Sequence, residues 1–236
     1  MNLYIGTSGY SYKEWKGDFY PEDLSDKEFL KFYATKLNSV EINNTFYRLP
    51  KESVMKSWSE HVPAEFRFSV KASQKITHIK RLKDVGDETE YLIRTARIMG
   101  DRLGVLLFQL PPNMKKDIER LRQFFKLLSG DIKVALEFRN TSWFDDDTYT
   151  VLKENNSSLC IADFDEKLEV PFVSTANWGY LRLRREGYTG PDLKKWMKRI
   201  HDQKWNSAFV YFKHENTEQS PPTLALKFRS LERKAT

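Results

Sequence analysis

The stretch that decides the fold is residues 105–138, VLLFQLPPNMKKDIERLRQFFKLLSGDIKVALEF. Its two apolar runs, 105–110 and 134–138, have the length and composition of buried strands. Between them, apolar residues recur every three or four positions, and Gly130 stands where a helix C-cap is expected. The apolar face of this predicted helix consists of Ile118, Leu121, Phe124, Phe125 and Leu128. The stretch therefore predicts two parallel strands joined by a helical crossover.

The rest of the chain repeats this alternation of strand and helix. Helix signals include a capping box formed by Ser25 and Glu28, and Pro191 at the start of another amphipathic stretch. Segment 163–179 shows little helical period, and we expect it to be irregular. Eight apolar runs in all are predicted to be strands: 3–5, 40–42, 66–70, 105–110, 134–138, 159–162, 180–183 and 209–212.

Eight strands that alternate with helices predict a parallel sheet closed into a (β/α)8 barrel of the TIM type. The 236 residues leave roughly 30 for each unit, so we expect one domain that spans residues 1–236. An open, doubly wound sheet is the alternative. No glycine-rich phosphate fingerprint follows the first strand, which disfavours the dinucleotide-binding form of that alternative.

Composition narrows the class of protein. The formal charge of +6 makes polyanions reasonable partners, but 39 basic and 33 acidic residues are interspersed as on a mixed solvated surface. Only residues 227–234 form a distinctly basic end, in a segment expected to be a terminal helix. We find no signal peptide and no apolar run of membrane-spanning length, and the lone Cys160 excludes an internal disulfide. We therefore expect a cytoplasmic protein without a membrane partner, and a buried, inert thiol.

Polar residues gather where the predicted strands end. In a barrel these ends meet at the C-terminal mouth, which is where barrel enzymes hold their active sites. Alternate residues of a strand face the same side. Three pairs are therefore expected to face the barrel axis: Glu41 with Asn43, Glu137 with Arg139, and Arg182 with Arg184. Such charges can neutralise one another in a buried network, although the desolvation of so many is costly without a function.

Five ordered motifs resemble the domain-of-unknown-function 72, or YecE-like, family. They are GTSGYSYKEWKGDFYP at 6–21, VEINNTFYRLP at 40–50, FSVKAS at 68–73 with ITH at 76–78, LLFQLPP at 106–112 and EFRNTSW at 137–143. The resemblance covers nearly the whole chain and implies a TIM-type barrel without an established activity. It also implies that matching positions line the mouth: Thr7, Ser8, Tyr10, Trp15, Glu41, Asn43, Thr45, Tyr47, Lys71, His78, Gln109, Glu137, Arg139 and Trp143.

The chain departs from the family pattern at two strand ends. Many members resemble YxRxHG on strand seven, whereas this chain has YLRLRR at 180–185, with arginine in place of histidine. On strand eight many resemble YFNN, and this chain has YFKHE at 211–215. Both exchanges add positive charge to the predicted mouth.

The first functional hypothesis is an enzyme that acts on a phosphate-bearing or other anionic small molecule, as a hydrolase, lyase or isomerase. Barrels often bind phosphate after strands seven and eight, where arginine forks suit phosphate or carboxylate. The catalytic candidates, for proton transfer or charge stabilisation, are Glu41, Lys71, Glu137 and Arg139. The substrate-binding candidates are Thr7, Ser8, Tyr10, Trp15, Asn43, Thr45, Tyr47, His78, Gln109, Trp143, Asp163, Arg182, Arg184, Lys213 and His214.

The second hypothesis is a nucleic-acid-binding or nucleic-acid-processing protein. Positive charge and a rim of aromatic residues resemble the pattern of single-strand binders, although such aromatics more often pack the loops of a barrel. The aromatic residues concerned are Tyr10, Tyr12, Trp15, Phe46, Tyr47 and Trp143. A non-catalytic scaffold is the third reading.

Some chemistries are disfavoured. Gln109 and Arg182 stand where a common barrel glycosidase would carry its carboxylate pair. Only four histidines are present, and His61 and His201 fall in predicted helices, which disfavours a multi-metal centre. We predict no metal ligands, with one Mg²⁺ held by Glu137 and Asp163 as the open alternative. The sequence identifies no cofactor and no oligomeric state.

Overall fold

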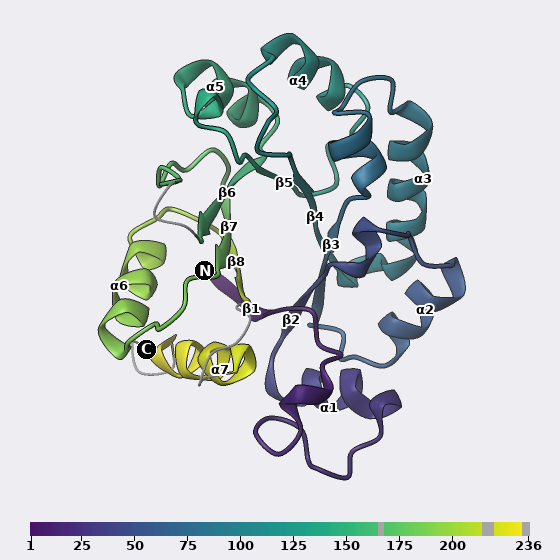
Figure 1. Cartoon of the computed structure of the whole chain (residues 1–236), viewed down its shortest axis with the longest axis vertical. Helices are drawn as coiled ribbons and strands as arrows, with labels where there is room; N and C mark the ends of the chain where they lie inside the picture. The colour runs from purple at the N-terminus through teal and green to yellow at the C-terminus, as the bar shows by residue number, and fades with distance from the viewer. Residues whose placement is uncertain (165–167, 214–219, 233–236) are drawn as a thin grey trace.

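Eight parallel strands pair in chain order and close into a barrel, because β1 is hydrogen-bonded to both β2 and β8. The structure is a computed structural model that describes residues 1–164, 168–213 and 220–232. Figure 1 shows the ring of strands seen from its C-terminal mouth. The strands are β1 (Asn2–Ser8), β2 (Ser39–Ile42), β3 (Arg67–Lys71), β4 (Leu103–Gln109), β5 (Val134–Glu137), β6 (Ser158–Asp163), β7 (Trp178–Leu183) and β8 (Ser207–Phe212).

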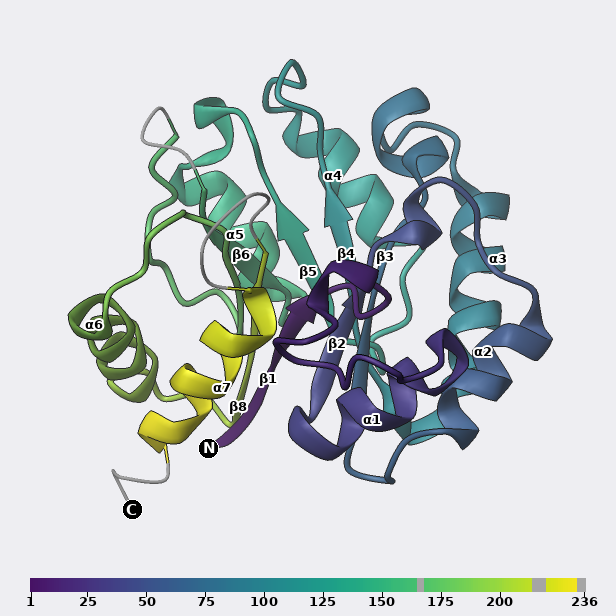
Figure 2. The same ribbon diagram turned by 60° about the horizontal axis from the view of Figure 1, so that its bottom comes forward.

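The helices form an outer layer around the ring, as Figures 1 and 2 show. They are α1 (Phe29–Lys36), α2 (Glu52–Glu60), α3 (Gly86–Ala96), α4 (Ile118–Phe125), α5 (Asp146–Glu154), α6 (Gly190–His201) and α7 (Pro221–Glu232). Short 3₁₀ turns precede or follow several of them: η1 (Lys13–Trp15), η2 (Asp26–Glu28), η3 (Asn44–Phe46), η5 (Arg97–Arg102) and η6 (Thr141–Trp143). A π-turn, η4 (Lys75–Ile79), follows β3. Within the described residues, no helix joins β6 to β7.

The predicted barrel and its eight strands are confirmed, and so are the irregular connection after β6 and the terminal helix. Pro191 does stand at the start of α6, beside a capping box formed by Thr189 and Asp192. Two predicted helix ends are wrong. Ser25 does not cap through its side chain, because residues 26–28 form a 3₁₀ turn held by a backbone bond to its carbonyl. Gly130 is no C-cap, because α4 ends at Phe125 and a turn follows.

Both faces of the strands are buried, which creates two cores. The outer core fills the space between strands and helices. The inner core fills the barrel and contains Val105, Leu107, Ala135, Cys160, Trp178, Tyr180, Phe209 and Tyr211. The Tyr211 hydroxyl lies 2.6 Å from Ser39 Oγ and 2.7 Å from Ser69 Oγ, so polar groups bridge three strands at this level. Burial holds the pKa of the Cys160 thiol well above its ordinary value, which fits the expected inert thiol.

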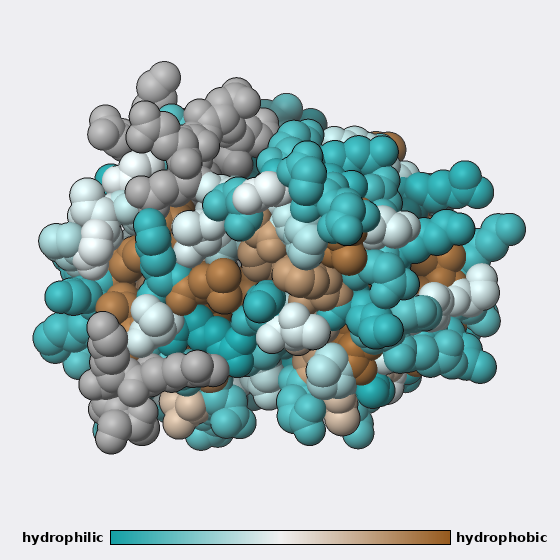
Figure 3. Space-filling view, turned by 90° about the horizontal axis from the view of Figure 1, so that it is seen from below, coloured by the Kyte–Doolittle hydropathy of each residue, from teal (hydrophilic) through white to brown (hydrophobic). Residues whose placement is uncertain are grey.

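The surface of one flank is mixed (Figure 3), in keeping with the interspersed charges of the sequence. Figure 3 shows the flank where α1 and α7 lie, on which hydrophilic residues predominate and hydrophobic stretches are short. Among the described residues, no helix is long and apolar enough to cross a bilayer.

Candidate functional site

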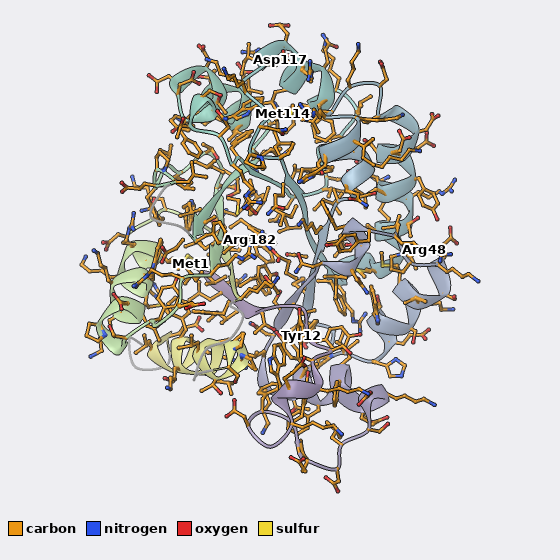
Figure 4. The ribbon with its side chains drawn as sticks, viewed as in Figure 1. Met1, Tyr12, Arg48, Met114, Asp117 and Arg182 are labelled. Carbon is orange, nitrogen blue, oxygen red and sulfur yellow. The ribbon has the colours of Figure 1, made fainter. Side chains whose placement is uncertain are left out.

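A buried ion cluster lies inside the mouth of the barrel. Arg182 on β7 donates through Nη2 to Glu41 Oε1 on β2 at 2.9 Å, and through Nη1 to Glu137 Oε2 on β5 at 2.6 Å. Figure 4 shows Arg182 near the middle of the ring, with Met114 and Asp117 toward its outer side. Arg182 is only 2% exposed, and both carboxylates are as well covered. Removal of one member of such a buried ion cluster destabilises the fold, because a remaining buried charge then has no partner.

Glu41 is saturated by donors. Besides Arg182, Oε1 accepts from Ser8 Oγ at 2.6 Å and from Asn43 Nδ2 at 3.0 Å, and Oε2 accepts from Tyr180 Oη at 2.6 Å. Burial alone would raise the pKa of this carboxyl, but the Arg182 charge and the three other donors lower it to about 2. Glu41 is therefore a fixed anion near neutral pH, unsuited to proton exchange there.

Glu137 is the inner end of a chain of hydrogen bonds that connects it through Gln109 to Lys71. Its Oε1 accepts from Gln109 Nε2 at 2.8 Å, and Gln109 Oε1 accepts from Lys71 Nζ at 2.9 Å. Burial opposes ionisation of Glu137, yet Arg182 and Arg184 lower the pKa of its carboxyl below the ordinary value. Glu137 thus orients Gln109, which in turn fixes the amine of Lys71.

Lys71 stands half-buried at the end of β3, and no carboxylate of the described residues lies within salt-bridge distance of it. Its Nζ lies 4.1 Å from the centroid of the Phe46 ring. Burial and the Arg182 charge lower the pKa of Lys71 to about 8, against the opposing pull of the two buried glutamates. Near neutral pH this amine therefore exists in both protonation states.

His78, on η4, stands against the same aromatic ring. Its imidazole meets the Phe46 ring at 4.9 Å between centroids and 87° between planes, and its Nδ1 lies 2.9 Å from Thr77 Oγ1. Burial and the charges of Lys71 and Arg139 lower the pKa of His78. The imidazole is therefore mostly neutral at pH 7, as a proton acceptor must be.

Two further arginines complete a cationic rim. Arg139 and Arg184 lie on the ring of Phe164, with guanidinium-to-centroid distances of 5.3 and 5.1 Å. Neither forms a salt bridge among the described residues, and the buried Nε of Arg184 has no hydrogen-bond partner. Burial and the Arg182 charge lower the pKa of Arg184. We define the cationic rim as Lys71, Arg139 and Arg184.

Some predicted site residues point away from the mouth. Thr7 faces the helix layer, where its hydroxyl donates to Gly9 O at 2.6 Å and its N–H donates to the Tyr33 hydroxyl of α1. Asp163 shares the outward face of Ile161 and accepts from Tyr188 Oη at 2.6 Å. The structure does not bring either side chain together with the buried ion cluster, because each follows the outward parity of its strand.

Two of the six residues in the predicted aromatic rim, Trp15 and Trp143, are buried. Trp15 is 7% exposed and packs among Tyr12, Phe19 and Tyr20. Trp143 is 1% exposed, stacks on Phe138 and donates to a backbone carbonyl. These two tryptophans pack loops against the barrel, and their rings are unavailable for stacking on a base.

The remaining predicted residues occupy several environments. Thr45 is buried and donates to Lys71 O at 2.7 Å, which fixes η3 to the end of β3. Tyr10 is partly buried in the aromatic core, whereas Tyr47 is 76% exposed. Lys213 follows β8 and its N–H donates to the Leu183 carbonyl. His214 lies outside the described residues.

Two residues of this site were missing from the predicted set: Tyr180 donates to Glu41, and Phe164 supports the two rim arginines. Phe46, which was named only in the predicted aromatic rim, supports Lys71 and His78. The inward parity of Tyr180 with Arg182, two residues on, could have indicated the first of the two missing residues. No comparable sequence pattern indicated Phe164.

The described residues contain no cluster of three or more histidine, cysteine, aspartate or glutamate side chains suited to a metal. The magnesium alternative fails for a geometric reason. Glu137 points into the barrel toward Arg182, while Asp163 points outward to Tyr188, so the two carboxylates do not converge.

A family model described as a protein of unknown function, DUF72, matches residues 4–236. The chain belongs to this family. The UPF0759 protein YunF of Bacillus subtilis is 26% identical over 230 residues, which cover 92% of this chain and 80% of that protein. The UPF0759 protein YecE of Escherichia coli K12 is 31% identical over 144 residues, 60% of this chain and 50% of that protein.

Solved structures agree with the membership of the chain in DUF72. A DUF72 family protein from Thermotoga maritima superposes with a TM-score of 0.86 at 26% identity, over 99% of this chain and 100% of the other. One from Enterococcus faecalis gives 0.70 at 20% identity, over 98% of each chain. A D-psicose 3-epimerase from Clostridium cellulolyticum gives 0.57 at 12% identity, over 100% of this chain and 93% of that one, a likeness of fold alone.

Proposed function

We propose that this DUF72 chain is an enzyme whose barrel mouth binds a small anionic substrate that carries a phosphate or a carboxylate. The observation that carries the proposal is an imbalance of charge. Arg182 and the cationic rim bring four positive side chains against the two carboxylates of Glu41 and Glu137, when Lys71 is protonated. Both carboxylates are used by Arg182, so within the described residues the rim charges have no carboxylate partner, and we assign an anion from outside to them.

The roles differ from those expected from sequence. Arg182 is enclosed between two glutamates, so we assign it to hold the mouth in shape rather than to bind the substrate. Glu41 and Glu137 act as its fixed counter-ions rather than as proton donors or acceptors. Arg139 and Arg184 bind the anion, because their guanidinium groups suit phosphate and carboxylate.

The remaining rim residue supplies chemistry. The amine of Lys71 exchanges between its charged and neutral forms near neutral pH, which suits a group that gives and takes protons. His78 stands on the same ring and supplies a second acceptor.

Thermal unfolding in the presence of inorganic phosphate, citrate and phosphosugars tests the proposal. A ligand at 100 times its dissociation constant stabilises the fold by about 2.7 kcal/mol, which raises the melting temperature of a chain of this size by about 5 °C. The Arg184→Ala variant should lose this shift. The Arg185→Ala variant is the matched control, because Arg185 faces Asp163 and Asp192 at the surface. An equal shift in both variants would refute the assignment.

A nucleic-acid ligand is the second candidate function. Two exposed aromatics at the mouth, Tyr47 at 76% and Phe164 at 43% exposure, and the formal charge of +6 favour it. Oligonucleotide affinity that falls steeply with salt, together with no response to small anions, would replace the first proposal by this one.

A further inference from the structure

The amine of Lys71 is held in a setting unlike that of an ordinary surface lysine. Among the described residues its one hydrogen bond goes to the neutral amide of Gln109, and the amine lies 4.1 Å from the centroid of the Phe46 ring. Lys75, four residues along the chain, shows the usual arrangement, with an ion pair to Glu88 at 2.7 Å. The end of β3 therefore presents an amine that is positioned by a hydrogen bond but has no carboxylate partner in the part of the chain that the structure describes.

We propose that Lys71 is a nucleophile that forms a Schiff base with an aldehyde or ketone that also carries a phosphate or carboxylate. This inference rests on the anion site proposed above and names the substrate class of that site. Arg139 and Arg184 would bind the anionic group of the molecule, and its carbonyl carbon would meet Lys71 Nζ.

The surroundings raise the neutral fraction of the amine before the reaction. Burial and the Arg182 and Arg184 charges disfavour the ammonium form, and the pKa of about 8 leaves about a tenth of the amine neutral at pH 7. That is about 300 times the neutral fraction of a lysine at the ordinary value of 10.5. Only the neutral amine has the lone pair that attacks a carbonyl.

The same surroundings stabilise the product. A protonated imine is a cation with one N–H, and it forms where the ammonium stood. The face of Phe46 attracts a cation at this distance, and Gln109 Oε1 is already placed to accept the remaining N–H. Glu137 fixes that amide through Nε2, so the acceptor is oriented before the substrate arrives.

The reaction balances without an external oxidant or reductant. The Nζ lone pair forms a bond to the carbonyl carbon, the C–O π electrons move to oxygen, and a proton passes from nitrogen to that oxygen to give a carbinolamine. A second proton converts the hydroxyl into water, which leaves as the C=N bond forms. His78 shares the Phe46 ring with Lys71; it carries the first proton from nitrogen to oxygen and delivers the second from solvent to the hydroxyl, so the imine keeps its N–H.

Reductive trapping tests the inference. The purified full chain is incubated at pH 7.5 with glyoxylate or with glyceraldehyde 3-phosphate, reduced with borohydride, and analysed by intact mass and peptide mapping. We expect one adduct per chain, on Lys71, and it should form about 10- to 100-fold faster than adducts on other lysines. This factor is smaller than the increase in neutral fraction, because a less basic amine is also a weaker nucleophile. Excess inorganic phosphate should slow adduct formation on Lys71. Acetaldehyde, which carries no anionic group, should not react with Lys71 in preference to other lysines.

Variants separate this inference from the proposed function. Lys71→Met should abolish the fast adduct, whereas the matched control Lys75→Met should keep it. Slower trapping of Lys71 in the wild-type chain when phosphate is added provides the same test, and it does not depend on the folding of a variant. Trapping spread evenly over the lysines, while phosphate still raises the melting temperature, would overturn the Schiff base and leave the anion site intact. Loss of both responses would overturn both proposals.

Discussion

The buried cluster around Arg182 predicts a large loss of stability in Arg182→Met. The substitution keeps most of the side-chain volume but leaves Glu41 and Glu137 as buried carboxylates without a cation. Removal of one partner of such a buried pair costs about 3–5 kcal/mol. With an unfolding entropy of about 2.1 cal/mol/K per residue, 236 residues give about 0.5 kcal/mol/K, and hence a drop in melting temperature of about 6–10 °C.

The pH dependence of this loss gives a second readout. In the wild type the pKa of Glu41 is lowered to about 2, so its stabilising effect is complete above its unfolded pKa of about 4.3 and declines as pH falls toward 2. In Arg182→Met, burial without the cation raises the pKa of both carboxyls, and protonation then relieves the buried charge. The difference between the two melting temperatures should therefore narrow from pH 7 to pH 5.

Differential scanning calorimetry at both pH values measures these effects. Arg185→Met is the control, since Arg185 is 43% exposed and its ion pairs contribute less than about 1 kcal/mol, or about 2 °C. An Arg182→Met protein that melts within about 2 °C of the wild type at pH 7, or a difference that is unchanged at pH 5, would show that the cluster is not what holds the mouth together.

Three further results are expected. Tyr180→Phe removes a donor to the buried Glu41 and should cost about 1–3 kcal/mol in urea unfolding, and a cost near zero would mean that water replaces the hydroxyl. Gly6→Ala places a methyl carbon 1.8 Å from a carbonyl oxygen of β2, so it should abolish soluble expression, whereas Gly130→Ala, which meets nothing within 4 Å, should fold normally. Cys160 should react with Ellman's reagent only in denaturant, and a fast reaction of the native chain would contradict its burial.

The order of strands and helices could be predicted from the sequence because local patterns carry it. Each strand is an apolar run of limited length, and each of several helices shows an apolar face, as residues 105–138 do. Eight repeats then leave few ways to bury both faces of a parallel sheet, and closure into a barrel is one of them.

The direction of side chains at the strand ends could not be predicted in the same way. Barrel strands are apolar on both faces, so hydrophobicity does not distinguish the axis from the helix layer. Thr7 and Ser8 look alike in sequence, yet Thr7 points outward to Tyr33 while Ser8 donates to Glu41 inside the barrel. Asp163 likewise follows the outward parity of β6, where it accepts from Tyr188.

The sequence by itself determined which charged groups lie at the ends of strands, but not which of them turn toward the barrel axis, as Asp163 shows. Which of them neutralise one another was decided only by the tertiary structure. Arg182 meets Glu41 across 141 residues of chain and Glu137 across 45, and those contacts exist only once the barrel closes with its strands in register. In the low-dielectric interior the attraction between Arg182 and the two carboxylates is strong, so both carboxylates pair with Arg182. Among the described residues, Lys71 and Arg184 therefore remain at the entrance without a carboxylate partner.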